Sequence, residues 1–130
     1  MRRRLAFAVL PLLALAACQS PEPAPAPVTV VFFNADSAAL DENAQAIVAQ
    51  AAGMAKERPN APVRVRGFAA PDSGTAAFNK ALATTRAQHV ADHLAENGIP
   101  RSRIRIRSRG AVPFDSFPTR SRRVEIVIGQ

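Results

Sequence analysis

The chain has 130 residues, a length that suits one folded domain, and it carries 17 basic against 10 acidic side chains. Its single cysteine excludes an intrachain disulfide. The chain has no Trp and no Tyr, so it lacks the aromatic side chains on which nucleic-acid bases usually stack.

The first 17 residues have the pattern of an export signal, with three arginines before an apolar run at residues 5–15 that is short for a membrane span. Residues 15–18, Leu-Ala-Ala-Cys, resemble the bacterial lipobox. This resemblance implies cleavage before Cys18 and acylation of that residue, palmitate included. The glutamine that follows implies the periplasmic face of the outer membrane. Without the three leading arginines, the charge balance is 14 − 10 = +4.

A proline-rich spacer follows the cysteine. Residues 19–27 alternate proline with other residues, a composition that favours polyproline II and spans roughly 25–30 Å at about 3.1 Å per residue. We therefore divide the chain into a signal peptide at 1–17, a lipidated cysteine and linker at 18–27, and a folded domain at 28–130.

Two strands and a helix are predicted for the first half of the domain. Residues 28–33 are β-branched or aromatic on both faces and predict a buried strand, and residues 34–37 have turn chemistry. Asp41 is placed to cap a helix that runs to about residue 58. Residues 63–68 alternate valine with arginine, which predicts a strand with the valines inward.

A long amphipathic helix is predicted at residues 78–94. Its apolar side chains fall on one half of the helical wheel, and Arg86 lies inside that arc. An unpaired guanidinium in a core is unfavourable. Either its stem packs on apolar neighbours while its head reaches water or a structural carboxylate, or the head is a fork aimed at an anionic ligand. The wheel alone leaves both interpretations open.

Two further strands, at residues 103–107 and 123–128, complete the predicted domain. The order strand, helix, strand, helix, strand, strand predicts an α+β fold with two helices packed on a small mixed sheet. Every second residue from 101 to 109 is an arginine, so these side chains are expected on one side of the third strand. They form either a solvated face or a basic stripe for glycan carboxylates, lipid A phosphates or another polyanion.

Four strings in the right order resemble the OmpA-like domain, shared by the C-terminal domain of outer-membrane protein A, the peptidoglycan-associated lipoprotein and flagellar motor protein B. Residues 32–40 resemble the family's opening strand and D-S-A-x-L turn, and residues 78–87 match the spacing of Y-N-x-x-L-S-x-x-R-A. Residues 98–104 resemble G-I-P-x-x-R-I, and residues 121–126 resemble N-R-R-V-E-I with serine for asparagine. The likeness covers roughly residues 30–128 and implies an OmpA-like fold.

The resemblance also implies a ligand. In the family, an arginine and an aspartate hold the zwitterionic free end of diaminopimelate in the peptidoglycan stem peptide, and Arg86 matches the arginine. The aspartate position falls on Ala70 or Pro71, depending on the direction of counting, because the loop is one residue longer here. Asp72 is adjacent and either serves the ligand or caps the next helix. Arg86, Asp72 and Asn79 are the predicted peptidoglycan-binding residues.

Catalysis and metal binding are not expected. His89 and His93 lie four residues apart on the helix, but no third ligand accompanies them, so partly exposed helix histidines are the better interpretation. Ser73 lacks the strand–elbow–helix setting of a hydrolase nucleophile, and no paired base is apparent. We predict no enzyme activity, no metal and no cofactor.

These features predict a lipoprotein anchored in the outer membrane through acylated Cys18, which binds peptidoglycan non-covalently and tethers the membrane to the cell wall. The expected partners are peptidoglycan, outer-membrane lipid and other envelope proteins, with no nucleic acid. The alternative is a protein-interaction or envelope-assembly module with a degenerate peptidoglycan site, because neither Ala70 nor Pro71 can bind an ammonium group. A third hypothesis is a polyanion-binding surface made by the arginine stripe.

Overall fold

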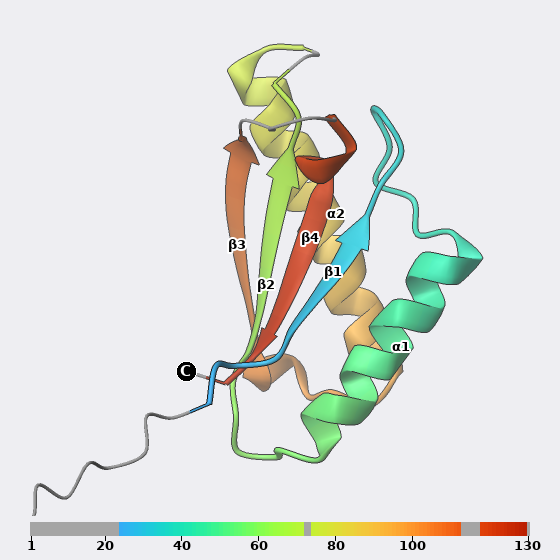
Figure 1. The fold of residues 1–130 in the computed structure, drawn as a ribbon, viewed down its shortest axis with the longest axis vertical. Helices are drawn as coiled ribbons and strands as arrows, with labels where there is room; N and C mark the ends of the chain where they lie inside the picture. The colour runs from blue at the N-terminus through green and yellow to red at the C-terminus, as the bar shows by residue number, and fades with distance from the viewer. Residues whose placement is uncertain (1–23, 72–73, 113–117, 130) are drawn as a thin grey trace, which may run out of the picture.

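The computed structural model describes residues 24–71, 74–112 and 118–129, which form a four-stranded sheet with two helices on one face (Figure 1). In chain order the elements are β1 (Val28–Phe32), α1 (Glu42–Lys56), β2 (Val63–Ala69), α2 (Ala76–Glu96), the 3₁₀ turn η1 (Arg101–Arg103), β3 (Ile104–Ala111), the 3₁₀ turn η2 (Pro118–Arg120) and β4 (Arg123–Ile128). The predicted α+β class is confirmed. The expected signal peptide, Cys18 and Asp72 lie outside the described residues.

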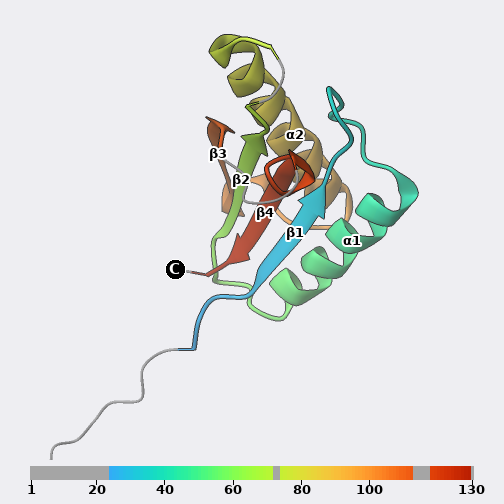
Figure 2. The ribbon, with the colours of Figure 1, turned by 45° about the horizontal axis from the view of Figure 1, so that its top comes forward.

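The sheet is mixed, with strand order β1-β4-β2-β3. Strand β4 is antiparallel to both β1 and β2, whereas β2 and β3 are parallel. Strands β1, β2 and β3 therefore run in the same direction, and their carboxyl ends meet at one end of the sheet, here called the carboxyl edge. The connections that leave β1 and β2 lie at this edge, while the chain enters β1 at the opposite end (Figures 1 and 2).

The hydrophobic core lies between the sheet and the two helices. Alternate residues of the strands supply one apolar layer, because successive side chains of a strand point to opposite faces. The buried strand residues on this side are Val31, Val63, Val65, Val124, Ile126 and Ile128. The helices close the core with Val48, Ala51 and Ala55 from α1, and with Ala87, Val90 and Leu94 from α2. All of these residues lie within the predicted domain, so the folded unit contains its own core.

The ends of the helices agree with the sequence at Asp41 and Gly98, but α2 begins at Ala76, two residues before the predicted start, and its cap is Thr75 and not Asp72. The Asp41 carboxylate accepts a hydrogen bond from the backbone N–H of Ala44 at 2.7 Å, which caps α1 as expected. Helix α2 is capped by the Thr75 hydroxyl, which accepts from the N–H of Phe78 at 3.1 Å. Gly98 follows the helix with a positive φ of 96°, a conformation that glycine adopts without strain.

Three expectations about the strands are corrected. Strand β1 is not buried on both faces: it is an edge strand, and Val28 and Phe32 remain 53% and 51% exposed. Strand β3 extends to Ala111, beyond the predicted residue 107. The arginine stripe is interrupted, because Arg101 and Arg103 lie in η1 and not on the strand.

Arg101 and Arg103 instead make contacts that stabilise the fold. Nη1 of Arg101 pairs with the Asp92 carboxylate at 2.8 Å. The guanidinium of Arg103 donates to the carbonyl oxygens of Ala55, Arg58 and Ala61 at 2.8–3.0 Å. Arg103 thereby satisfies carbonyl groups at and after the end of α1, where the helix leaves them without internal partners.

Candidate functional site at the carboxyl edge

Arg86 of α2 joins the two connections that leave β1 and β2. Its side chain is fully buried, and its three nitrogen atoms each donate to a main-chain carbonyl. Nε bonds to Ser37 at 2.8 Å and Nη2 to Asn34 at 3.0 Å, both in the β1–α1 connection, and Nη1 bonds to Phe68 of β2 at 3.2 Å. The guanidinium thus holds the carboxyl edge together.

The head of Arg86 is buried against main-chain carbonyl oxygens and does not reach bulk water, whereas its role toward an anionic ligand stays a prediction. It lies among carbonyl dipoles, and the ring of Phe33 lies 5.3 Å from its central carbon. The three bonds use three of the five N–H groups of a guanidinium. Arg86 is therefore a structural clamp that retains the geometry of an anion-binding fork.

The electrostatic surroundings of Arg86 favour an added negative charge. Burial is the main cause that lowers the pKa of Arg86 to about 10, the nearby charge of Arg122 lowers it further, and the charge of Asp36 raises it. The guanidinium stays protonated at neutral pH but is incompletely compensated. An anion at this edge would stabilise the charged form.

A glycine sets the position of Arg86 against the sheet. A Cβ atom on Gly67 of β2 would lie 2.0 Å from the carbonyl oxygen of Ala83 and 3.1 Å from the Cβ of Ala87. Helix α2 therefore crosses β2 at a point where only glycine leaves enough space. One turn further along α2, the same close approach places the Arg86 head over the end of β2.

Asn79 lies two turns before Arg86 on α2, so both project from a similar side of the helix. Its side chain is 3% exposed, and its Oδ1 atom has no hydrogen-bond partner among the described residues. Buried polar atoms of native proteins are usually paired, so an unpaired acceptor next to a surface edge needs an explanation. An acceptor held in this way is suited to a donor supplied by a ligand.

The acidic half of the site was only partly anticipated from the sequence. Neither Ala70, which is buried, nor Pro71, which is exposed, has a carboxylate to replace the family aspartate, and Asp72 lies outside the described residues. The sequence indicates only a turn around Asp36, but its charge acts on Arg86. It stands between Asn34 and Ser37, whose carbonyls bind that guanidinium, and its positive φ of 49° is uncommon for a residue with a side chain.

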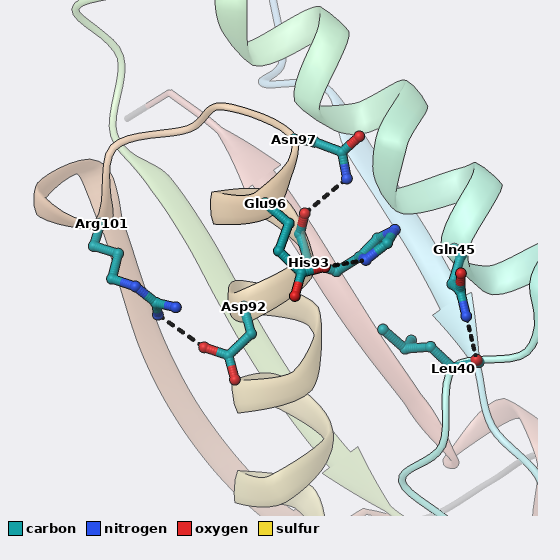
Figure 3. Close-up of polar contacts among 7 residues, drawn as sticks. All are labelled: Leu40, Gln45, Asp92, His93, Glu96, Asn97 and Arg101. Atoms are coloured by element: carbon teal, nitrogen blue, oxygen red, sulfur yellow. Dashed lines mark hydrogen bonds and ion pairs between the residues drawn. The ribbon is translucent and has the colours of Figure 1, made fainter.

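The two histidines of α2 line a groove of about 280 Å³ together with Leu40, Asp92 and Glu96. Nδ1 of His93 contacts the Glu96 carboxylate at 3.0 Å, and Nδ1 of His89 lies 2.6 Å from the carbonyl oxygen of Ala38 (Figure 3 for His93). Within residues 24–71, 74–112 and 118–129, no group of three His, Cys, Asp or Glu side chains could hold a metal ion. These contacts account for both histidines structurally.

The fold and the site define a class: an α+β domain in which a buried arginine joins the connections at the carboxyl ends of β1 and β2. None of the helices in the described part of the chain is long and apolar enough to cross a membrane. Residues 32–124 match the OmpA family, and the chain belongs to that family. The resemblance found in the sequence is confirmed. Members of this class are non-catalytic modules, which agrees with the prediction that the chain is not an enzyme.

Curated relatives align with 62–63% of the chain. The chain is 40% identical over 82 residues to "Outer membrane protein 40" of Porphyromonas gingivalis, an alignment that spans 63% of this chain and 21% of that protein. It is 34% identical over 80 residues to the "Peptidoglycan-associated lipoprotein" of Rhizobium meliloti, spanning 62% of this chain and 45% of the relative. The alignments thus span less than half the length of these relatives.

Solved structures share the same architecture. The crystal structure of the peptidoglycan-associated lipoprotein from Burkholderia pseudomallei superposes with a TM-score of 0.70 at 25% identity, covering 77% of this chain and 89% of that one. The C-terminal domain of Helicobacter pylori MotB gives a TM-score of 0.66 at 26% identity, covering 77% and 82% of the two chains. Both similarities agree with two helices packed on a mixed four-stranded sheet.

Proposed function

We propose that this protein is an envelope lipoprotein of the outer membrane that binds the peptidoglycan stem peptide non-covalently and tethers the membrane to the cell wall. Support comes from the OmpA family match and from relatives that are named outer membrane protein and peptidoglycan-associated lipoprotein. The observation that carries the proposal is that a similar side of α2 holds a buried, positively charged guanidinium and a buried acceptor, Asn79 Oδ1, that has no hydrogen-bond partner among the described residues.

The free end of diaminopimelate carries a carboxylate and an ammonium group on one carbon atom. The two N–H groups of Arg86 that its three carbonyl bonds leave over would bind the carboxylate, because charge-assisted bonds to a guanidinium are strong. Asn79 Oδ1 would accept from the ammonium group. Asp36 or Asp72 would supply the negative charge that the family aspartate provides elsewhere, since Ala70 and Pro71 cannot.

The anchor forms the second half of the proposal. Cys18, once acylated, would hold the chain in the inner leaflet of the outer membrane, and the proline-rich spacer would follow. The chain enters β1 at the end of the sheet opposite the carboxyl edge (Figure 1). This polarity suits a tether, because the membrane attachment and the ligand site lie at opposite ends of the domain.

One observation favours the alternative of a protein-interaction module with a degenerate site. Arg86 already donates to three carbonyl oxygens and is fully buried, so a ligand carboxylate must find the two N–H groups left over or displace a carbonyl. The absence of a carboxylate at Ala70 and Pro71 points the same way. In this case the domain would bind an envelope protein at the same edge.

Binding to isolated sacculi and to soluble muropeptides separates the two functions. Wild type should co-sediment with sacculi and bind a muropeptide with a free diaminopimelate end, but not one whose end carboxylate is amidated. Arg86→Lys, Asn79→Leu and Asp36→Asn should each weaken binding, and Asp72→Ala reports the contribution of the longer loop. A folded wild-type protein that binds neither preparation would leave the protein-interaction module as the function.

The anchor is tested independently of the ligand. Expression of the full chain and of Cys18→Ser, followed by membrane fractionation and mass spectrometry of the N-terminal peptide, should give an acylated peptide in the outer-membrane fraction for wild type only. A soluble, unmodified wild-type protein would refute the anchor and leave the peptidoglycan test unaffected.

A further inference from the structure

The face of the sheet that carries no helix has an unusual composition. Residues that are paired across neighbouring strands point to the same face, so the strand register defines this surface. We call it the helix-free face; it comprises Val28, Val30 and Phe32 of β1, Arg123, Glu125 and Val127 of β4, Arg64 and Arg66 of β2, and Arg105 and Arg107 of β3. No helix covers it in Figure 1.

Positive charges lie side by side on this face. Arg64 is opposite Arg105, and Arg66 is opposite Arg107, in the parallel register of β2 and β3. Adjacent strands are about 4.8 Å apart, and like charges directly opposite one another destabilise a sheet. The four strands together carry six arginines and a single acid, Glu125.

The one acid cannot neutralise this cluster. Glu125 is shared, because its two oxygens pair with Nη2 of Arg66 and with Nε of Arg123, both at 3.0 Å. Nε of Arg66 is buried without a hydrogen-bond partner among the described residues. An open groove of about 320 Å³ lies between the arginine side chains and is lined by Arg64, Arg66, Arg107, Ser108 and Arg109. The groove has the size and the charge to take up an anion.

Protection of a sheet edge against pairing with another chain explains only some of the arginines on the helix-free face. Charged side chains on an edge strand discourage pairing with another chain, and this accounts for the arginines of β3. Strand β2 lies between β4 and β3, so Arg64 and Arg66 need another explanation. Nη2 of Arg64 also donates to the carbonyl oxygen of Gly129 at 2.9 Å, which leaves its charge uncompensated.

The other side of the same face is apolar. Val28 and Phe32 of β1 are about half exposed, and they occupy the same face as the arginines because β1, β4 and β2 pair in register. The surface therefore changes from apolar on β1 to cationic on β2 and β3. An apolar strip beside arginines is the composition of segments that lie in the interface of an anionic membrane.

We propose that the helix-free face docks on an anionic phospholipid surface. The guanidinium groups of β2 and β3 bind lipid phosphates, for which an arginine fork is well suited, and Phe32 and Val28 enter the interfacial region. Carboxylates of a glycan strand would match the arginines but would leave the apolar strip without a partner. The carboxyl edge with Arg86 lies at the end of the strands and not on this face, so docking and the proposed peptidoglycan site involve different residues.

The chain offers a direct probe, because it contains no tryptophan and Phe32→Trp introduces a single fluorophore on the face. The test uses the chain from residue 18 onward with Cys18→Ser, which retains the whole described core and lacks both leader and acyl groups. Vesicles of phosphatidylcholine with phosphatidylglycerol should shift the emission of Phe32→Trp to the blue, and vesicles of phosphatidylcholine alone should not. Phe78→Trp on α2, also about half exposed, should not respond.

A triple variant tests the charges. Arg105→Gln, Arg107→Gln and Arg109→Gln together should weaken vesicle binding roughly 100-fold, since one arginine near an anionic surface contributes about a five-fold effect. The control, Lys56→Gln with Arg58→Gln and Lys80→Gln, removes the same number of charges from exposed sites on or beside the helices and should change binding less than about three-fold.

Four results would overturn the proposal: no vesicle binding by the folded chain, equal losses in the two triple variants, a response at residue 78 in place of residue 32, or binding to an acidic polypeptide without binding to vesicles. Muropeptide binding measured on the same proteins should be unchanged by the Arg105, Arg107 and Arg109 substitutions. A failure of membrane docking is thereby distinguished from a failure of the peptidoglycan proposal.

Discussion

Nε of Arg86 donates a hydrogen bond to the carbonyl oxygen of Ser37 at 2.8 Å, and this bond ties α2 to a segment that lies 49 residues earlier in the chain. With the bonds to Asn34 and Phe68, it fixes the guanidinium relative to two connections and one strand. A ligand at the carboxyl edge would meet a head group that is already held in place, so little side-chain ordering would accompany binding. The same bonds make Arg86 important for stability.

Replacement of Arg86 should destabilise the fold as well as affect binding. Arg86→Met leaves three carbonyl groups without their donor, and we expect the free energy of unfolding to fall by about 2–4 kcal/mol. Urea denaturation followed by circular dichroism measures the change. Arg58→Met, at an exposed site, is the control and should stay within about 0.5 kcal/mol of wild type. A loss below about 1 kcal/mol for Arg86→Met would contradict the clamp.

The contact between β2 and α2 should not tolerate a methyl group. Gly67→Ala places a Cβ atom 2.0 Å from the Ala83 carbonyl oxygen, so α2 must shift, and we expect a loss of about 2–3 kcal/mol or more in the free energy of unfolding. Gly53→Ala is the matched control: nothing lies within 4 Å of its Cβ position in α1, and the better helix propensity of alanine should add about 0.5–1 kcal/mol. Equal effects of the two substitutions in thermal unfolding would disprove the close-packing argument.

Substitution of Asn79 should raise stability and weaken ligand binding. Asn79→Leu replaces a buried acceptor that is unpaired in the described part of the chain by an apolar side chain of similar size, so we expect the free energy of unfolding to rise by about 1 kcal/mol. Calorimetric titration with a muropeptide should show weaker binding by the same variant. A variant that is strongly destabilised would assign Asn79 a structural role instead.

Asp36→Asn tests the candidate acid without disturbing its turn. Asparagine tolerates the positive φ of this residue, so the fold should keep its stability within about 0.5 kcal/mol. Loss of the carboxylate removes a charge that favours protonated Arg86 and would serve the ligand ammonium, and we expect about ten-fold weaker muropeptide binding. Unchanged binding in Asp36→Asn together with a loss in Asp72→Ala would assign the acidic role to Asp72.

The pKa of Arg86 sets the pH range over which its contribution to the free energy of unfolding changes. Its folded-state pKa of about 10 lies below the ordinary arginine value, so between these two values the unfolded chain binds more protons than the folded one. The contribution of Arg86 to stability therefore rises with pH in that window and is constant below it. The difference in unfolding free energy between wild type and Arg86→Met should be flat from about pH 6 to 9 and should increase above about pH 10. A slope between pH 6 and 8 would instead indicate a histidine.

The local periodicities of the sequence were sufficient to predict the order of the helices and strands. The valine–arginine alternation of β2, the Asp41 cap and the turn at Gly98 each depend on neighbouring residues, and the structure confirms all three. The wheel of α2 also places Arg86 among the apolar side chains, and the structure shows that the whole side chain is buried. The four sequence segments that resemble the OmpA-like domain predict the fold, because their order along the chain matches the OmpA family.

The amino-acid sequence by itself determined the two helices and four strands, their order, the family and the position of Arg86 on the apolar side of its helix, since these depend on local spacing. Only the tertiary structure decided that β1 is an edge strand, that Arg103 caps a helix end, and that Arg64 and Arg66 lie beside Arg105 and Arg107. It also placed Asp36 near Arg86 and left the side-chain oxygen of Asn79 without a hydrogen-bond partner among the described residues. These relationships join residues that lie far apart in the chain. Strand pairing, helix packing and burial bring such residues together, and no local sequence pattern encodes them.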